Sequence, residues 1–251
     1  DIYMSYEWNA LGDYITLGTR AMPQTAGTLA FWVRPTWAQT DALAHFYFSQ
    51  YSVGNYFLVQ HWTDNNLYVG WKAADVDYRV TVSSYTQNQN AWNCFVITWD
   101  DVANSTVVRL NGTQIGSNSS LATVSLTGVT RVLGSFDTAS SYEDVRGRMA
   151  DFAIWNVVLS ASQIAAYESR VPAIRIAAQN LENYWPLRGS AVDFGLFPTN
   201  GTLNSVTVED HAPIGLMRPR KRVITYAAGA APPPSTKVHI IGAALKGVLS
   251  G

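Results

Sequence analysis

Short apolar stretches separated by turn residues dominate the first two hundred residues of the chain. Many of them alternate between apolar and polar positions, the period of a strand that buries one face. We expect an all-β fold. The pattern predicts strands at Tyr14 to Leu17, Thr28 to Arg34, Ala44 to Gln50, Tyr56 to His61, Leu67 to Trp71, Tyr78 to Val82, Trp92 to Trp99, Thr106 to Leu110, Thr130 to Leu133, Arg148 to Trp155 and Glu182 to Leu187.

The sharpest local signal is the pair Asn111-Gly112, which lies between the apolar positions of residues 107–115. Both residues tolerate the positive φ of a tight turn between antiparallel strands. The pair therefore predicts a β-hairpin.

One helix is predicted among these strands. Ser160 is a suitable N-cap, and Gln163 follows three residues later, as in a capping box. The helix should cover Ala161 to Glu168 and end before Pro172. A single short helix argues against a parallel sheet, which needs a helix after most strands, so we expect two antiparallel sheets packed as a sandwich.

The composition supports a large core: 47% of the residues are hydrophobic, 12% are aromatic and 14% are charged. No apolar run approaches the roughly 20 residues that span a bilayer, so we expect no membrane span. Cys94 is the single cysteine of the chain and lies in the apolar run Trp92 to Trp99. It can form no intrachain disulfide, and we interpret it as a small core residue.

The charges divide the chain into two parts. Residues 1–214 hold all 18 Asp and Glu against 11 Lys and Arg, a net charge of −7, whereas residues 215–251 hold six Lys and Arg and no acid. Pro232-Pro233-Pro234 keeps the second part extended. We expect a sandwich domain at 1–214 and, at 215–251, an extended basic tail that docks on another protein subunit.

The docking residues expected in the tail are five of its six basic side chains, namely Arg218, Arg220, Lys221, Arg222 and Lys237. Charge alone would also attract a nucleic acid or an anionic surface. The acidic body and the lack of interleaved aromatic residues favour an acidic or grooved protein partner over nucleic acid.

Several segments together resemble the concanavalin A-like lectin/glucanase superfamily, in particular its laminin-G-like and pentraxin-like branch. The resemblance covers residues 5–212 and depends on the order of the segments. It implies a jelly-roll sandwich whose last strand returns beside the first. The segments are Gly27 to Pro35, Trp92 to Asp100 with the Asn111-Gly112 hairpin, Gly147 to Ser160, Tyr184 to Leu187, and Asn200 to Leu203.

Glucanases of this superfamily place carboxylates at alternate positions of one strand, where both face the glycosidic bond. The motif Glu-x-Asp-x-x-Glu is missing from this sequence, and no glutamate is followed two residues later by an acid. The histidines also lack a metal-ligand spacing or a nucleophile elbow. We therefore expect a protein that is not an enzyme.

An acidic loop at residues 137–144 is a candidate calcium site, because hard cations bind carboxylate and carbonyl oxygens that converge in a flexible loop. The resemblance implies such a site at one rim of the sandwich, with Asp137, Glu143, Asp144 and Asp151 as ligands. The chain has Ala150 and Asp151 where many relatives have two successive acids, so it departs from the family's pattern at this calcium site. The alternative is a solvated acidic loop without a metal.

Sugar recognition requires a flat aromatic face beside polar side chains. Five aromatic residues fall in predicted loops or strand ends near Asn, Gln or Asp, namely Trp37, Tyr51, Trp62, Tyr85 and Tyr142. The alternative is that they fill the core. We assign that role to the tryptophans inside predicted strands or next to them, which are Trp32, Trp92, Trp99, Trp155 and Trp185.

The leading functional hypothesis is a non-catalytic, lectin-like structural or adhesion component of a larger assembly, anchored by its tail. A virus or phage particle is the expected setting, with the protein oligomeric or assembly-bound, on a virion surface or outside the cell, and in contact with surface glycans. The alternative is a free secreted carbohydrate-binding module or calcium-dependent lectin. A glucanase-type glycoside hydrolase is the third hypothesis.

Overall fold

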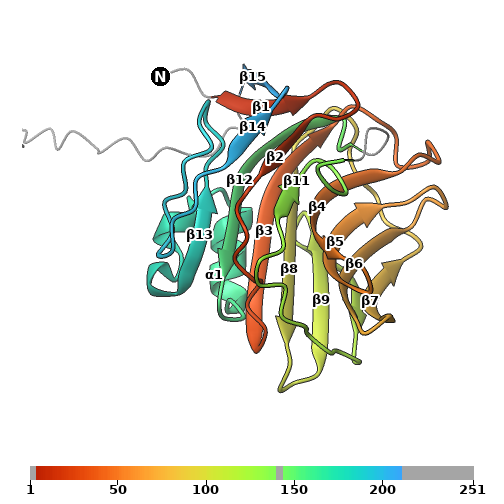
Figure 1. Ribbon diagram of the computed structural model, residues 1–251, viewed down its shortest axis with the longest axis vertical. Helices are drawn as coiled ribbons and strands as arrows, with labels where there is room; N and C mark the ends of the chain where they lie inside the picture. Colours follow the sequence, from red (N-terminus) through yellow and green to blue (C-terminus); the bar gives the residue numbers. More distant parts are fainter. Residues whose placement is uncertain (1–3, 140–143, 211–251) are drawn as a thin grey trace, which may run out of the picture. The chain divides into compact units, whose positions relative to one another are not determined.

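The computed structural model describes residues 4–139 and 144–210, which form two packed antiparallel β-sheets (Figure 1). All of them belong to the unit Asp1–Leu216 that the backbone contacts define. Tyr142, Glu143 and the predicted tail at 215–251 lie outside the described residues. No helix in the described part of the chain has the length and apolar character needed to cross a bilayer.

Sheet A has eight strands. Seven follow the order β10-β9-β8-β3-β12-β1-β15, and β13 pairs with the end of β12 that β1 leaves free. The bounds are β1 (Met4–Trp8), β3 (Ala26–Pro35), β8 (Asn93–Asp100), β9 (Ser105–Leu110), β10 (Thr113–Asn118), β12 (Gly147–Trp155), β13 (Leu181–Trp185) and β15 (Thr207–Asp210).

Sheet B has seven strands in the order β14-β2-β11-β4-β5-β6-β7, and β4 to β7 follow one another along the chain. Figure 1 shows these four strands as one curved layer facing sheet A. The bounds are β2 (Tyr14–Thr16), β4 (His45–Ser52), β5 (Asn55–His61), β6 (Leu67–Ala73), β7 (Val76–Val82), β11 (Arg131–Leu133) and β14 (Thr202–Asn204).

The architecture confirms the predicted two-sheet antiparallel sandwich, and each of the eleven predicted stretches contains a strand. The sequence pattern missed β1 and β15, which pair with each other at one edge of sheet A. β14 lies beside β2, in the place that the resemblance implied for the returning strand. β14 and β15 have three and four residues, which gives a local pattern little to detect, although β2 and β11 are as short and were predicted.

Both local predictions are confirmed. Asn111 and Gly112 have φ of 50° and 84° and join β9 to β10 as a two-residue hairpin. The helix α1 (Ala161–Glu168) begins after Ser160, which forms the capping box with Gln163. Two short 3-10 turns, η1 (Ala173–Arg175) and η2 (Ala178–Asn180), lead from α1 to β13.

The main core fills the space between the sheets, where Phe31, Phe57, Trp99 and Phe152 pack within 6 Å of neighbouring aromatic rings. A second, smaller apolar cluster lies on the outer face of sheet A, beneath α1 and η1. It contains Cys94, buried as expected from the sequence. Sheet A is therefore covered on both faces over part of its area.

Candidate functional site

The outer face of sheet B is the face turned away from sheet A. Within β5, Phe57 and Val59 point into the core between the sheets. Because side chains alternate along a strand, Tyr56, Leu58 and Gln60 lie on the outer face. These three side chains form the centre of a hollow of about 430 Å³.

We call this hollow the sheet B groove. Its wall is mainly aromatic, with a few polar side chains, which is the composition of many ligand sites. Strands β4 to β7 and the segments that follow β5 and β11 contribute to it. Its lining residues are Phe46, Tyr51, Tyr56, Leu58, Gln60, Trp62, Asp64, Tyr68, Arg79 and Phe136.

Gly70 lies between two residues that line the groove. It lies in β6, opposite Leu58 of β5 on one side and Arg79 of β7 on the other. Its φ is +134°, and an added Cβ would come within 3.0 Å of the Arg79 backbone. Any other residue would be strained here and would press against the backbone of β7.

Asp77 fixes the side chains at one end of the groove. The Tyr56 hydroxyl donates a hydrogen bond of 2.7 Å to Asp77, and the Arg79 guanidinium lies 3.3 Å from the same carboxylate. Burial, followed by this hydrogen bond, raises the pKa of Tyr56 well above its usual value, so the phenol stays neutral. The Tyr56 ring also lies beside the ring of Tyr51, with the centroids 6.2 Å apart.

Asp64 fixes the other end. It accepts hydrogen bonds from the Tyr68 hydroxyl at 2.6 Å and from the backbone and side-chain nitrogens of Asn66 at 3.0 and 2.9 Å. Burial is the largest single influence and alone would raise the pKa of Asp64, but these hydrogen bonds together outweigh it and lower the pKa. The guanidinium of Arg79 lies over the Tyr68 ring at 4.4 Å. The tyrosines at both ends are thus held before any ligand arrives.

The structure places two of the five predicted sugar-binding residues, Tyr51 and Trp62, in this groove. Both are half-buried. The edge of the Phe46 ring faces the Trp62 ring at 6.2 Å, and Tyr51 packs on Phe136 at 4.3 Å. Each ring is thus held from one side by an aromatic neighbour, while Tyr142 lies outside the described residues.

Trp37 and Tyr85 do not line the groove, because both are packed into the main core between the sheets. The Trp37 indole donates to the Val145 carbonyl at 2.7 Å and stacks on His45 at 3.8 Å. The Tyr85 hydroxyl lies 2.8 Å from a ring nitrogen of His61. Both loops fold inward and close one end of the sandwich, which a strand pattern does not reveal.

Of the predicted calcium ligands, the three that the structure describes, Asp137, Asp144 and Asp151, form no metal-binding group. Asp144 is buried and pairs with Arg146 at 3.2 Å, whereas Asp151 lies beneath α1 and accepts a hydrogen bond from Tyr184. Asp137 is half-buried and accepts from the Ala139 backbone at 2.8 Å. Burial raises the pKa of both Asp144 and Asp151 to about 6. Among the described residues, no three His, Cys, Asp or Glu side chains gather into a metal-binding group, so the expected calcium site does not fit them.

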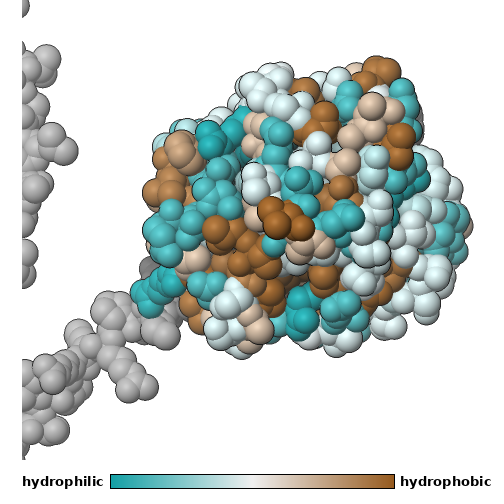
Figure 2. Space-filling model, turned by 90° about the horizontal axis from the view of Figure 1, so that it is seen from below, coloured by the Kyte–Doolittle hydropathy of each residue, from teal (hydrophilic) through white to brown (hydrophobic). Residues whose placement is uncertain are grey.

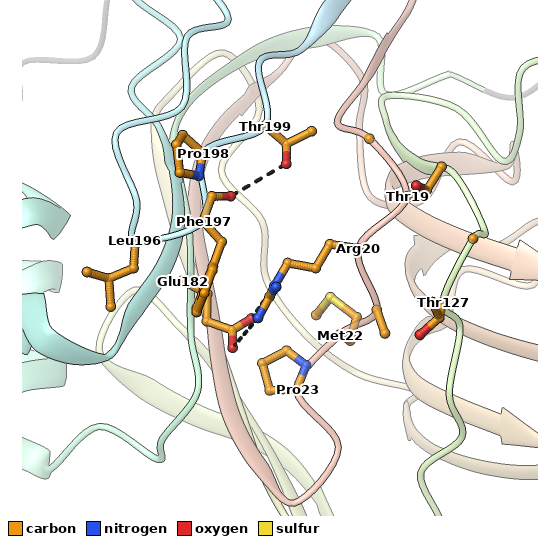
Figure 3. Close-up of a pocket in the computed structure, with 13 residues that line it drawn as sticks. Thr19, Arg20, Met22, Pro23, Thr127, Glu182, Leu196, Phe197, Pro198 and Thr199 are labelled. Carbon is orange, nitrogen blue, oxygen red and sulfur yellow. Dashed lines mark hydrogen bonds and ion pairs between the residues drawn. The ribbon is translucent and has the colours of Figure 1, made fainter.

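A larger hollow of about 940 Å³ lies between residues 18–23 and 196–199 (Figure 3). Its charged groups are already paired, because Nε and Nη2 of Arg20 lie 3.1 and 3.2 Å from the carboxylate of Glu182. The Arg20 guanidinium also covers the Phe197 ring at 3.8 Å. This hollow therefore offers less open aromatic surface than the sheet B groove.

Sequence reasoning missed Tyr56, Gln60, Asp64, Tyr68 and Arg79. The sequence did contain a signal for two of these residues. Tyr56 and Gln60 are four positions apart in one predicted strand, so their side chains lie on the same face of the sheet. The intervening apolar residues hid it, because Asn55–His61 reads as a strand buried on both faces. The contributions of β6 and β7 depend on strand register, which no local pattern gives.

Comparisons with known proteins agree with the two-sheet fold. Residues 9–165, more than half of the chain, match a family model described as the concanavalin A-like lectin/glucanases superfamily. A search of curated proteins found no match. Three solved structures illustrate the fold that the chain shares with proteins of low sequence identity.

The first is a heptameric, SAP-like pentraxin from Limulus polyphemus, with 12% identity and a TM-score of 0.59 over 85% of this chain and 98% of that one. A protein of Bacteroides ovatus described as carbohydrate-binding has 18% identity and a TM-score of 0.61 over 85% of this chain and 62% of that one. The sialyllactose-bound CBM40 of a Ruminococcus gnavus sialidase has 12% identity and a TM-score of 0.50 over 65% and 96%. The chain belongs to the concanavalin A-like lectin/glucanase superfamily.

Proposed function

We propose that the protein binds glycans, without cleaving them, through the sheet B groove. The observation that carries this proposal is the set of aromatic rings fixed by carboxylates on an open sheet face. Sugars present apolar C–H faces and hydroxyl groups, which match aromatic rings and hydrogen-bonding side chains respectively. Membership of a superfamily that contains lectins supports the same interpretation.

Glycan-array screening followed by calorimetry on the full chain tests this proposal. We expect Trp62→Ala and Tyr51→Ala each to weaken binding by about fivefold, since an aromatic contact contributes roughly 1 kcal/mol. Phe194→Ala is the matched control, because Phe194 is 55% exposed and lies outside the groove. Equal binding by all three variants, or no binding of any glycan by the parent protein, would overturn the proposal.

We further propose that the protein is a structural or adhesion component of a larger assembly, held there by residues 215–251. The support is the contrast between an acid-free basic segment and an acidic body, which favours docking on another polypeptide. The likeness to a heptameric pentraxin is consistent with an oligomer. Apolar patches on the face drawn in Figure 2 are a second kind of contact surface.

A virus or phage particle, or another extracellular surface, is the setting that we propose for this assembly. Deletion of residues 215–251 should leave the sandwich folded and its glycan binding intact, but abolish incorporation into the particle or oligomer. Native mass measurement of the full and shortened chains reads this out. A full-length monomer whose folding is lost on deletion would instead identify a free secreted carbohydrate-binding module.

Calcium dependence and glycan hydrolysis each have a direct test. A calcium-dependent lectin would lose glycan binding on chelation, whereas we expect binding to persist in EDTA, because the described acidic residues do not converge on a cation site. A glucanase would release product from the glycan that it binds. Release of reducing ends during a prolonged digest would contradict the non-catalytic function.

A further inference from the structure

We infer that the sheet B groove selects uncharged glycans over glycans that carry carboxylate or sulfate groups. This inference depends on the proposed function, since it specifies the ligand of the same groove. It follows from the charges and hydrogen-bonding groups that face the hollow.

Carboxylates stand at both ends of the groove. Asp64 lines it directly, and Asp77 lies behind Tyr56 and Arg79. An anionic sugar would bring another acceptor-only group towards these two charges. Like charges placed together in a binding site are unfavourable and exclude the wrong ligand.

Arg79, the cation that lines the groove, and Lys72, which lies beside Tyr56, are both already paired with aspartates. Arg79 lies 3.3 Å from Asp77 and stacks over Tyr68, so its charge is compensated and its plane is fixed. Lys72 lies 3.9 Å from Asp75 and 5.7 Å from the centre of the Tyr56 ring. A carboxylate ligand would have to compete with these aspartates for its own ion pair. With Asp64 counted, three aspartates against two cations leave this surface with a charge of −1.

The groups still available for hydrogen bonds are neutral. Gln60, on the floor, can donate and accept, and the Trp62 indole nitrogen can donate. No hydrogen bond from another described residue occupies either of these side chains. The Tyr56 hydroxyl donates to Asp77, which leaves its oxygen available to accept from a sugar hydroxyl, whereas the Tyr68 oxygen already accepts from the Asn66 side chain at 3.3 Å. Such a set suits hydroxyl groups, which both donate and accept.

The experiment compares pairs of oligosaccharides that differ only in one acidic sugar, such as a neutral chain and its sialylated or uronic acid form. We expect the full chain to bind the neutral member at least about tenfold more tightly. Gln60→Ala should weaken binding of the neutral member by about tenfold, because a sugar hydroxyl would lose its hydrogen-bond partner and be left unpaired.

Asp77→Asn sharpens the test. Asparagine keeps an oxygen for the Tyr56 hydroxyl but leaves the charge of Arg79 uncompensated. Affinity for the acidic member should rise by about threefold or more, with little change for the neutral one. Asp101→Asn, an exposed change in the turn between β8 and β9, is the matched control and should change neither affinity.

The outcomes separate the two proposals. Preferential binding of the acidic member, at the groove and lost in Trp62→Ala, would overturn the inference while leaving glycan binding intact. Binding of neither member across a broad panel would overturn the proposed function and the inference with it. If Asp77→Asn and Asp101→Asn raised the affinity for the acidic member equally, the selectivity would come from net charge rather than from the groove. That result would contradict the inference.

Discussion

The outer faces of the two sheets carry aromatic side chains of the same kinds but in different surroundings. On sheet A, Trp32, Trp155 and Tyr184 lie beneath α1 and its following turns and form a second apolar cluster. On sheet B, Tyr51 and Trp62 line an open groove. Figure 1 shows α1 on the side of sheet A away from β4 to β7. We call α1, η1 and η2 the cover of sheet A. Whether such a cover lies over an aromatic residue therefore decides whether that residue stabilises the fold or is available to a ligand.

The same contrast applies to the carboxylates. Beneath the cover, burial raises the pKa of Asp151 to about 6. On the open face, hydrogen bonds outweigh burial and lower the pKa of Asp64. A covered carboxylate thus carries a desolvation cost, while an exposed one organises its neighbours and keeps its charge.

Trp155→Ala should have the largest effect on stability. The side chain is fully buried, its indole donates to the Ile176 carbonyl at 2.7 Å, and its ring meets Tyr167 edge-on at 5.9 Å. We expect the free energy of unfolding to fall by about 3–5 kcal/mol, as for large cavities left by buried aromatic residues. Urea denaturation monitored by circular dichroism measures it.

Trp155→Phe accompanies this variant, because it keeps a ring but removes the indole hydrogen bond. It should lose less stability than Trp155→Ala and should bind glycans as tightly as the parent. A loss of glycan binding in the folded Trp155→Phe variant would break the separation between the two faces.

Asp151→Asn should stabilise the protein at neutral and higher pH. The pKa of Asp151 is raised to about 6 from its usual 3.8, so the folded state binds the proton more tightly than the unfolded state. Its contribution to stability is full below pH 4 and is lost as the pH rises towards 6 and above. The difference amounts to roughly 3 kcal/mol at pH 8, from 1.36 kcal/mol per unit.

Asparagine suits this position, because Asp151 has φ of 55° in a β-bulge of β12, a conformation that asparagine tolerates. Its side-chain oxygen can still accept the Tyr184 hydroxyl. Unfolding curves at pH 4 and pH 8 should agree between variant and parent at the lower pH and diverge at the higher one. A constant difference at both pH values would contradict a buried, titrating carboxylate.

The sequence predicted best those features that depend on neighbouring residues. The Asn111-Gly112 turn and the Ser160 cap were found because their physics is local. Trp37 and Trp62 looked alike in sequence, since each is a tryptophan in a loop near polar residues. Only the folding of distant segments buries Trp37 against Val145 and leaves Trp62 at the groove.

The groove was harder to predict than the sheets. Its floor requires Gly70 to face Arg79 and Leu58 across two strand pairs, and register follows from the packing of the whole sheet. The positions of the described residues that were predicted as calcium ligands show the same dependence on packing. Asp144 and Asp151 are close in sequence, but the bulge in β12 helps to place Asp151 in the cluster beneath α1.

Ser160→Ala tests how firmly the cover is held. The Ser160 side chain accepts from the Gln163 backbone at 3.3 Å, and the Gln163 side chain accepts from the Ser160 backbone at 2.9 Å. Losing the cap should reduce the free energy of unfolding by about 1 kcal/mol. Hydrogen exchange should increase in α1 and leave β4 to β7 unchanged. Faster exchange in those strands as well would mean that the two faces are energetically coupled.

Trp62→Ala should have the smallest effect on stability, about 0.5–1 kcal/mol, because the ring is half-buried and its described aromatic contact is the edge-on pair with Phe46. The same substitution should remove most glycan affinity. Thermal unfolding measured beside calorimetry on one preparation compares the two effects directly. Trp155→Phe should give the reverse ranking, with stability lost and binding kept. If Trp62→Ala instead destabilised the fold as much as Trp155→Ala, Trp62 would be a core residue. Its position on the open face of sheet B would then not make it available to a sugar.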